Sequence, residues 1–334
     1  MQQVKWLLAG AGDIATRRVG PALAAAGNSA VVAVCDLNRE RAAALAAQLG
    51  VEAVHTDYGR ALAESGANAV YIATPQGAHV DMSLKALEAG KHFLCEKPIA
   101  LNGTDGLRLL KAVRGTKLVA SVSNYRRLSE QCKLTDALLK RQEIGSLRGG
   151  WAVYSSPFYN PSNQPIRMAN GSSRIKELDF YLIDIAHNFF GMPVTVMAQA
   201  STLNKAVMND VDDISTIIMK FKGEELFTIV SNCNTPVLRH ELELFGDKGS
   251  VHWRQWPPHG NGPVRKTTVQ GEELIEANTN PNWHLPMVED YVDAVLTGRP
   301  PVCTVESAAK TEVITDAIFR SIKSGAAEPV PWED

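Results

Sequence analysis

The chain lacks the features that would place it in a membrane or on nucleic acid. None of its 334 residues belongs to an apolar run long enough to span a bilayer, which takes about 18 residues or more, so no transmembrane helix is predicted. The formal net charge is only -2, and lysine and arginine form no cluster. Because phosphate binding needs clustered cations, nucleic acid and anionic membrane surfaces are not expected as partners.

Cysteine is sparse as well. The five cysteines are scattered and form no C-x-x-C pair, so the sequence predicts neither a zinc site nor a disulfide framework. The apolar N-terminal stretch lacks a cleavage site and runs directly into a glycine turn, which favours a first strand over a signal peptide. These features are typical of a cytoplasmic protein that requires no metal.

Residues 1–123 alternate two kinds of segment. Short apolar runs are followed by alanine-rich helical runs, a pattern typical of parallel strands joined by right-handed crossovers. Strands are predicted at Val4–Ala9, Ala30–Cys35, Ala53–Thr56, Ala69–Ala73, His92–Cys95 and Lys117–Ser121, with helices at Ala15–Ala26, Arg39–Leu49, Tyr58–Ser65, Val80–Ala89 and Thr104–Val113. The first domain is therefore expected to be an α/β domain.

Residues 124–334 follow a different pattern, in which strand-like runs succeed one another. Strands are predicted at Leu147–Tyr154, Val194–Leu203, Asp213–Phe221, Leu226–Asn232, His240–Phe245 and Gly249–Arg254, with helices at Leu128–Lys140, Ile175–Phe190, Met287–Leu296 and Val305–Ser324. Turn residues join several of the strands, which indicates a largely antiparallel sheet of five or six strands. The second domain is therefore expected to be of the α+β class.

A glycine-rich motif lies between the first strand and the first helix. Gly10, Gly12, Asp13, Ile14 and Ala15 fit the G-x-G-x-x-A fingerprint of a Rossmann dinucleotide-binding domain. The first glycine permits the tight turn, the second lets the backbone approach a pyrophosphate, and the alanine allows close packing of helix on strand. The helix N-terminus supplies N–H groups for the phosphates. A plain strand-to-helix turn is the alternative interpretation.

Asp36 ends the second predicted strand, where a carboxylate can accept hydrogen bonds from the adenosine ribose. The same charge would repel a 2′-phosphate, so NAD is favoured over NADP. Arg39 and Arg41 follow closely. An arginine there can pair with a phosphate, and Arg41 is kept as a candidate cofactor contact, although a solvated helix face explains both residues equally well.

Two further motifs follow the fourth and fifth predicted strands. Thr74 and Pro75, with His79, follow one strand, and Glu96 and Lys97 follow the other. Ligands of open α/β sheets bind at the carboxyl ends of strands, so all five residues are candidates for the cofactor site. The alternative for Glu96 and Lys97 is a surface ion pair.

Together these motifs resemble the glucose–fructose oxidoreductase, inositol dehydrogenase and rhizopine-catabolism (Gfo/Idh/MocA) family over nearly the full length. The marks are the glycine turn, Ala73-Thr74-Pro75 with His79, the run from Ala89 to Ala100 that contains Glu96-Lys97-Pro98, and Asn124-Tyr125-Arg126-Arg127. The resemblance implies a Rossmann domain followed by an open-faced sheet that pairs subunits into a homodimer or homotetramer. It also implies that Lys97 touches both the nicotinamide ribose and the substrate oxygen.

The second motif of that family, GGGxxxDxGxHxxD, aligns with the segment from Gly171 to Asp184 with several departures. Glu177 stands at the first aspartate and Tyr181 at the catalytic histidine, while Asp179 replaces the inner glycine. Some relatives are similar in using tyrosine, so the resemblance implies Tyr181 as acid or base and Glu177 as an orienting group. A register that uses Asp184 and His187 has the wrong spacing, and His187 is interpreted as a packed or capping residue.

Further residues are candidates for substrate binding because aromatic rings stack on sugars and because the family often has an arginine before this motif. With Lys97, Tyr181 and Asp184, they are Tyr125, Trp151, Tyr154, Arg167 and His284, and Arg126 is a candidate for the cofactor. Trp151 and Tyr154 could equally be ordinary sheet packing.

The sequence therefore predicts reversible, NAD-dependent hydride transfer at a secondary alcohol of a sugar or polyol. Lys97 would polarise the oxygen and Tyr181 would exchange the proton. Two alternatives stay open. One is an NAD-dependent glycosidase that oxidises the sugar transiently, eliminates the aglycone, adds water and reduces again. The other is a non-enzymatic regulator that senses the dinucleotide.

Overall fold

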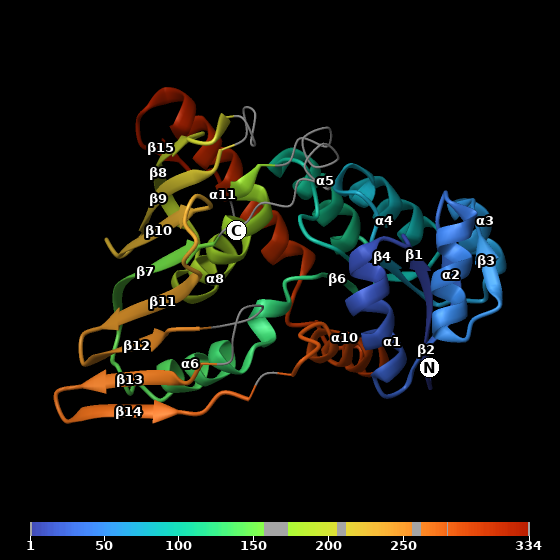
Figure 1. Cartoon of the computed structure of the whole chain (residues 1–334), viewed down its shortest axis with the longest axis horizontal. Coiled ribbons are helices and arrows are strands. Elements are labelled where there is room, and N and C mark those ends of the chain that lie inside the picture. Colours follow the sequence, from blue (N-terminus) through green and yellow to red (C-terminus); the bar gives the residue numbers. More distant parts are fainter. Residues whose placement is uncertain (1, 157–172, 206–211, 256–261, 279, 333–334) are drawn as a thin grey trace. The chain divides into compact units, whose positions relative to one another are not determined.

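Figure 1 shows the computed structural model of the chain, which describes residues 2–156, 173–205, 212–255, 262–278 and 280–332. The chain forms two compact units, one of Met1–Tyr125 with Asn280–Ala309 and the other of Arg126–Thr279 with Lys310–Asp334. The first unit thus includes a segment that follows the second sheet in the sequence. The domain limits expected from the sequence, 1–123 and 124–334, stay predictions. Among the described residues, no helix is both long and apolar enough to cross a membrane.

The first unit is built on a six-stranded parallel sheet with the order β3-β2-β1-β4-β5-β6. Its strands are β1 (Val4–Ala9), β2 (Ser29–Cys35), β3 (Ala53–His55), β4 (Ala69–Ile72), β5 (His92–Cys95) and β6 (Ala120–Val122). The strand order reverses between β1 and β4, the point at which such sheets bind dinucleotides at their carboxyl ends. The predicted Rossmann fold is confirmed.

The helices of this unit lie between the strands, as the alternating pattern predicts. They are α1 (Gly20–Ala25), α2 (Arg39–Leu49), α3 (Tyr58–Glu64), α4 (His79–Glu88) and α5 (Gly103–Arg114). Ahead of α1, Ala15–Val19 forms a π-helical turn, so the single helix expected at Ala15–Ala26 has two parts. Helix α2 starts where the Oδ1 atom of Asn38 accepts a hydrogen bond from the backbone of Arg41, because the first turn of a helix has unpaired N–H groups.

Helix α10 (Leu285–Thr297) belongs to the first unit although it comes late in the chain. It packs against α1 and β1. The ring centroids of Trp6 and Tyr291 lie 5.2 Å apart, and the Tyr291 hydroxyl donates to the carbonyl of Val119 at 3.2 Å. These contacts hold the segment just before α10, which contains His284, against the dinucleotide-binding sheet. Helix α11 (Val305–Ser324) follows and runs past the division between the units in the sequence.

The second unit is built on a nine-stranded sheet with the order β14-β13-β12-β11-β7-β10-β9-β8-β15. All neighbours are antiparallel except β10 and β7. The strands are β7 (Leu147–Ser155), β8 (Pro193–Ser201), β9 (Ile214–Phe221), β10 (Leu226–Asn232), β11 (Arg239–Gly246), β12 (Gly249–Trp253), β13 (Val264–Thr268), β14 (Gly271–Ile275) and β15 (Glu328–Pro329). The mostly antiparallel sheet is confirmed.

The expected count of five or six strands is wrong because three strands carry almost no apolar pattern. Strands β13 and β14 form a hairpin at one edge, in which β13 is half-buried and β14 largely exposed, and β15 is two residues long at the other edge. Their pairing comes from neighbours that already have a buried face rather than from hydrophobic alternation of their own. Apart from the β-branched residues of β13, little in these three segments signals a strand.

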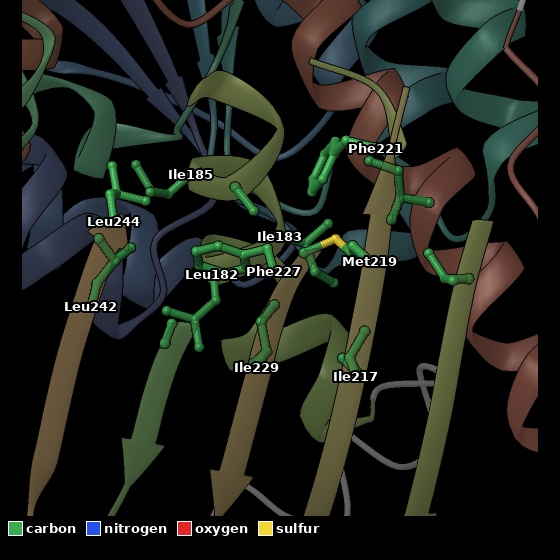
Figure 2. Packing of buried hydrophobic residues seen from close by; sticks show 14 of the residues in the cluster. Leu182, Ile183, Ile185, Ile217, Met219, Phe221, Phe227, Ile229, Leu242 and Leu244 are labelled. Atoms are coloured by element: carbon green, nitrogen blue, oxygen red, sulfur yellow. The ribbon is translucent and has the colours of Figure 1, made fainter. Parts of the chain in front are cut away.

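One face of this sheet is buried by α6 (Glu130–Lys140), the π-helical turn Ile175–Asp179, α8 (Phe180–Phe190) and part of α11. Figure 2 shows the side chains of α8 packed on those of the central strands. The core residues labelled there are Leu182, Ile183, Ile185, Ile217, Met219, Phe221, Phe227, Ile229, Leu242 and Leu244. Side chains alternate between the faces of a strand, so among the described residues the opposite face of the sheet has no comparable helical cover.

Candidate active site

Two glycines at the end of β1 have different structural roles. Gly10 has a φ of +100°, and a Cβ atom there would lie 2.4 Å from the carbonyl oxygen of Ala73, so only glycine fits. A Cβ atom on Gly12 would meet no atom within 4 Å. Gly10 is therefore required by the fold, whereas Gly12 keeps an open backbone surface at the start of the following helix, as a bound pyrophosphate needs. Asp13, one residue on, forms an exposed ion pair with Arg17 at 2.9 Å.

Asp36 ties the glycine turn to the end of β2. Its Oδ2 atom accepts a hydrogen bond from the backbone of Ala11 at 2.7 Å, and its Oδ1 atom accepts one from Asn38 at 2.8 Å. The next side chain, Leu37, is 93% exposed. The carboxylate thus lies at the end of β2 with an exposed apolar residue following it, and its contact with the ribose stays a prediction. Arg41 lies on the exposed face of α2.

His79 connects the loop after β4, which carries Thr74, to the loop after β5, which carries Pro98. It is 1% exposed, with Nδ1 2.7 Å from the Pro98 carbonyl and Nε2 2.8 Å from the Thr74 carbonyl. Burial lowers the pKa of His79, although both carbonyls favour the protonated ring. With both ring nitrogens engaged by backbone carbonyls, His79 keeps its expected role as a cofactor contact only as a prediction. It positions the loops, whereas Thr74 and Pro75 reach the surface at the end of β4.

Glu96, which directly precedes Lys97, is a buried carboxylate. Its Oε1 atom accepts a hydrogen bond from the Tyr71 hydroxyl at 2.7 Å and lies 3.4 Å from Nε2 of His284. Burial alone would raise the pKa of Glu96, but His284, Tyr71 and Lys97 outweigh it and lower the pKa. Burial and Glu96 raise the pKa of Tyr71, so its hydroxyl stays a donor. Tyr71 was missed from the sequence, where its only signal is a hydroxyl within an apolar strand.

In the second unit, the structure brings Tyr181, Arg126 and Tyr154 together. The guanidinium carbon of Arg126 lies 3.9 Å from the centroid of the Tyr181 ring. Arg126 is 1% exposed, and its Nη1 donates to Nε2 of His240 at 3.1 Å. His240 in turn packs edge-on against Tyr154, with ring centroids 5.0 Å apart. His240 was missed because its alternating strand predicts only an ordinary sheet position.

A buried carboxylate lies two residues before Tyr181. Asp179 is fully buried and accepts hydrogen bonds from the hydroxyls of Ser215 and Ser231. Burial raises its pKa, against the influence of Arg174 and the two serines. This cluster was missed because Asp179 stands where the family motif has a glycine. Glu177 lies in the preceding π-helical turn and is only half-buried.

The Asp184 carboxylate forms an ion pair within the second unit. It is 1% exposed and pairs with Arg127 through two bonds, Nε to Oδ2 at 2.7 Å and Nη2 to Oδ1 at 2.8 Å. Burial opposes the charge, but Arg127 and His187 lower the pKa of Asp184 to about 2. Asp184 thus forms a buried ion pair with Arg127, and its expected contact with the substrate stays a prediction. His187 is buried beside Thr311 at 2.9 Å, which fits the packed residue that was expected.

The remaining candidates for substrate binding lie in different parts of the structure. Trp151 is half-buried next to His252, and its neighbour Ala152 and Tyr154 are buried on the helix-covered face of β7. Because Trp151 and Tyr154 are three positions apart on one strand, they point to opposite faces, so the structure does not bring Trp151 to Tyr181. Arg167 lies outside the described residues.

Tyr125 and His284 pack together in the first unit, with ring centroids 4.9 Å apart. Among the described residues, no cluster of His, Cys, Asp or Glu could hold a metal.

A parallel sheet with a glycine turn at its switch point and an acid at the end of β2 defines a dinucleotide-binding protein. The chain belongs to the GFO/IDH/MocA family of oxidoreductases with an NAD-binding Rossmann fold. The family's Rossmann domain matches residues 4–124, and its C-terminal domain matches residues 133–252. The predicted family and enzyme class are confirmed.

Several relatives share the whole architecture. The chain is 26% identical over 337 residues to the uncharacterized oxidoreductase ORF334 of Rhizobium meliloti, covering 99% of this chain and 100% of the relative. It is 30% identical over 246 residues to a dTDP-3,4-didehydro-2,6-dideoxy-alpha-D-glucose 3-reductase of Saccharopolyspora spinosa, covering 72% of each chain. Among solved structures, levoglucosan dehydrogenase with NADH and levoglucosan superimposes with a TM-score of 0.89 at 20% identity, covering 99% of this chain and 100% of the other.

Proposed function

We propose that this protein catalyses reversible hydride transfer between NAD and a secondary alcohol of a sugar or polyol. The observation that carries the proposal is the buried phenol of Tyr181 held beneath the Arg126 guanidinium, on the helix that matches the second family motif. Bound NAD supplies the hydride acceptor. Relatives named as D-apiose, levoglucosan and inositol dehydrogenases support a sugar or polyol substrate.

Each candidate residue has a defined task in this reaction. Lys97 polarises the substrate oxygen and stabilises negative charge that develops on it. Tyr181 takes the hydroxyl proton in oxidation and returns it in reduction. A guanidinium against its ring stabilises the phenolate relative to the phenol, since opposite charges attract strongly where water is excluded. Glu177 is proposed to orient these groups, and Tyr125 and Tyr154 to contact the substrate.

We propose NAD rather than NADP as the preferred cofactor. The open backbone at Gly12 fits a pyrophosphate, and the Asp36 carboxylate fits two ribose hydroxyls but would repel a 2′-phosphate. The exposed Leu37 offers an apolar surface next to the ribose position. One relative, a D-xylose 1-dehydrogenase, is named for NADP, whereas levoglucosan dehydrogenase was solved with NADH. The preference is therefore tested by comparing the two cofactors directly.

The test is a panel of sugars, polyols and glycosides, each incubated with the purified protein and either NAD or NADP. We expect NADH to form, read by its absorbance, with one chemical class of substrate, and Lys97→Met to abolish it. Release of an aglycone without net NADH would replace the proposal with the glycosidase alternative. Binding of NAD without turnover of any compound would favour a dinucleotide-sensing regulator.

We also propose that the protein forms a homodimer or homotetramer through the face of the second sheet that lies opposite α6 and α8. Val194, Met197, Ile218 and Val230 are apolar and are 37–43% exposed there, and apolar patches of this kind mark association surfaces. Light scattering coupled to size exclusion should give two or four times the chain mass. Ile218→Lys with Met197→Lys should give monomers, and a monomeric wild type would contradict the proposal.

A further inference from the structure

His284 is a buried imidazole whose ring nitrogens both lack a hydrogen-bond partner within the described parts of the chain. It is 1% exposed, and its Nε2 atom lies 3.4 Å from Oε1 of Glu96. A buried donor without a partner is unfavourable, and a buried carboxylate with few donors is more so. A donor on His284 and an acceptor on Glu96 are therefore each suited to be the other's hydrogen-bond partner.

The position of His284 is set by backbone contacts rather than by Glu96. It precedes the first residue of α10, its carbonyl accepts from Val288 at 3.0 Å, and its N–H donates to the side chain of Asn282 at 3.2 Å. Asn282 also donates to the carbonyl of Arg18 at 2.9 Å. The His284 imidazole therefore projects from a segment whose backbone is held in place, so its position relative to the Glu96 carboxylate is fixed.

An aromatic column supports the other side of the ring. Tyr125 packs on His284, and Trp283 stacks on Tyr125 with ring centroids 6.0 Å apart. The Arg18 guanidinium covers Trp283 at 3.9 Å. Because Arg18 belongs to the helical segment that follows the glycine turn, the column runs from the dinucleotide-binding turn to Glu96.

The backbone on both sides of Lys97 is anchored in the first unit. The N–H of Glu96 donates to the Ile72 carbonyl at 2.9 Å, and the carbonyl of Pro98 is held by His79 at 2.7 Å. Lys97 therefore lies between two residues that are fixed in the interior. Lys97 also lowers the pKa of Glu96, so the two side chains are coupled electrostatically and a loss of the Glu96 charge would act on the lysine.

We infer that His284 is a positioning residue, which donates from Nε2 to Glu96 and so holds Lys97 in its reactive place. This inference rests on the proposed function of Lys97. The titratable groups that face Glu96 are Tyr71, Lys97, Cys95 and His79, besides His284 itself. Of these, Tyr71 and Cys95 stay neutral at ordinary pH because burial and Glu96 raise their pKa values.

The first experiment compares His284→Gln, which keeps a donor near the Nε2 position, with His284→Leu, which removes it. We expect His284→Leu to lower kcat by about 10–100-fold with less than about a threefold change in the KM for NAD, and to move the acidic limb of the kcat/KM profile to higher pH. His284→Gln should recover most of kcat. Equal impairment of the two variants, or an unchanged pH profile in His284→Leu, would overturn the inference.

The second experiment needs no turnover and so separates this inference from the proposed function. A double-mutant cycle on thermal unfolding combines His284→Leu with Glu96→Gln. We expect the two effects to be strongly non-additive at pH 7 and less so at pH 4. Additive effects would overturn the inference even if the enzyme is active. His92→Leu, at the opposite end of β5, where its ring accepts from the Val119 backbone at 2.9 Å, is the control and should leave the pH profile unchanged.

Discussion

The guanidinium of Arg126 covers the ring of Tyr181 at 3.9 Å, and both side chains are almost completely buried. A buried cation against an aromatic face is stabilised by the ring and stabilises negative charge on its oxygen in return. Since Arg126 also donates to His240, the cation is held on two sides. The Tyr181 ring, the candidate proton-transfer group, is thus held against a buried cation within the second unit.

Tyr181→Phe tests the phenol itself, because phenylalanine keeps the ring beneath Arg126 and removes only the hydroxyl. We expect kcat to fall by about 10²–10⁴-fold, the usual contribution of a positioned acid or base, with little change in NAD affinity measured by calorimetry. Tyr291→Phe is the matched control, since its hydroxyl is also buried but bonds only to the Val119 carbonyl. Comparable activity in Tyr181→Phe and wild type would remove Tyr181 from the mechanism.

Asp36→Asn tests cofactor choice by keeping an acceptor for the Ala11 N–H while removing the charge. Losing a charged acceptor should weaken NAD binding by about 10–150-fold, since such bonds contribute about 1.5–3 kcal/mol. NADP should bind more tightly than to wild type because its 2′-phosphate is no longer repelled. Both constants are measured by fluorescence titration. Glu40→Gln, which removes an exposed charge nearby, should change neither constant, and an identical response of the two variants would contradict a specific role for Asp36.

Gly10→Ala and Gly12→Ala should fail in different ways. At Gly10 the added carbon would lie 2.4 Å from a backbone carbonyl in a left-handed conformation, so we expect a loss of stability of about 2 kcal/mol or more. At Gly12 the carbon meets nothing, so stability should stay within about 0.5 kcal/mol of wild type. NAD binding should nevertheless weaken at least about tenfold in Gly12→Ala. Urea unfolding and calorimetry measure the two quantities, and normal NAD binding by Gly12→Ala would refute the pyrophosphate site.

Asp184→Asn should destabilise the protein in a pH-dependent manner. The pKa of Asp184 is lowered to about 2, below its unfolded value of about 3.9, so the ionised side chain stabilises the fold fully above about pH 4. At pH 7 we expect a loss of about 3–5 kcal/mol, because Arg127 is left buried without its charge partner. The difference from wild type should shrink as the pH falls towards 2.

Denaturant unfolding at several pH values measures this difference. Asp136→Asn, which breaks an exposed pair with Lys140 on α6, is the control and should cost no more than about 0.5 kcal/mol at any of these pH values. A pH-independent loss in Asp184→Asn would show that packing, and not the ion pair, accounts for its effect.

The structure agrees with the sequence wherever a local pattern was sufficient. Strand Val4–Ala9, helix Arg39–Leu49 and helix Val305–Ser324 have the predicted limits. Local signals mark the first two, since a glycine turn follows the strand and Asn38 caps the start of helix Arg39–Leu49. The roles of Gly10 and Asp36 follow from the same local logic. Strands β13, β14 and β15 escaped prediction because their pairing depends on neighbours rather than on their own residues.

By itself, then, the sequence determined a dinucleotide-binding α/β unit, a second antiparallel sheet and the positions of Lys97 and Tyr181 in two family motifs. Three features were decided by the tertiary structure alone. Asp184 forms an ion pair with Arg127, and His284 lies beside Glu96. Trp151 and Tyr154 point to opposite faces of their strand. The physical reason is distance along the chain. Periodicity and turn chemistry act over a few residues, whereas a buried charge is paired by any donor that folding brings to it, however remote in sequence.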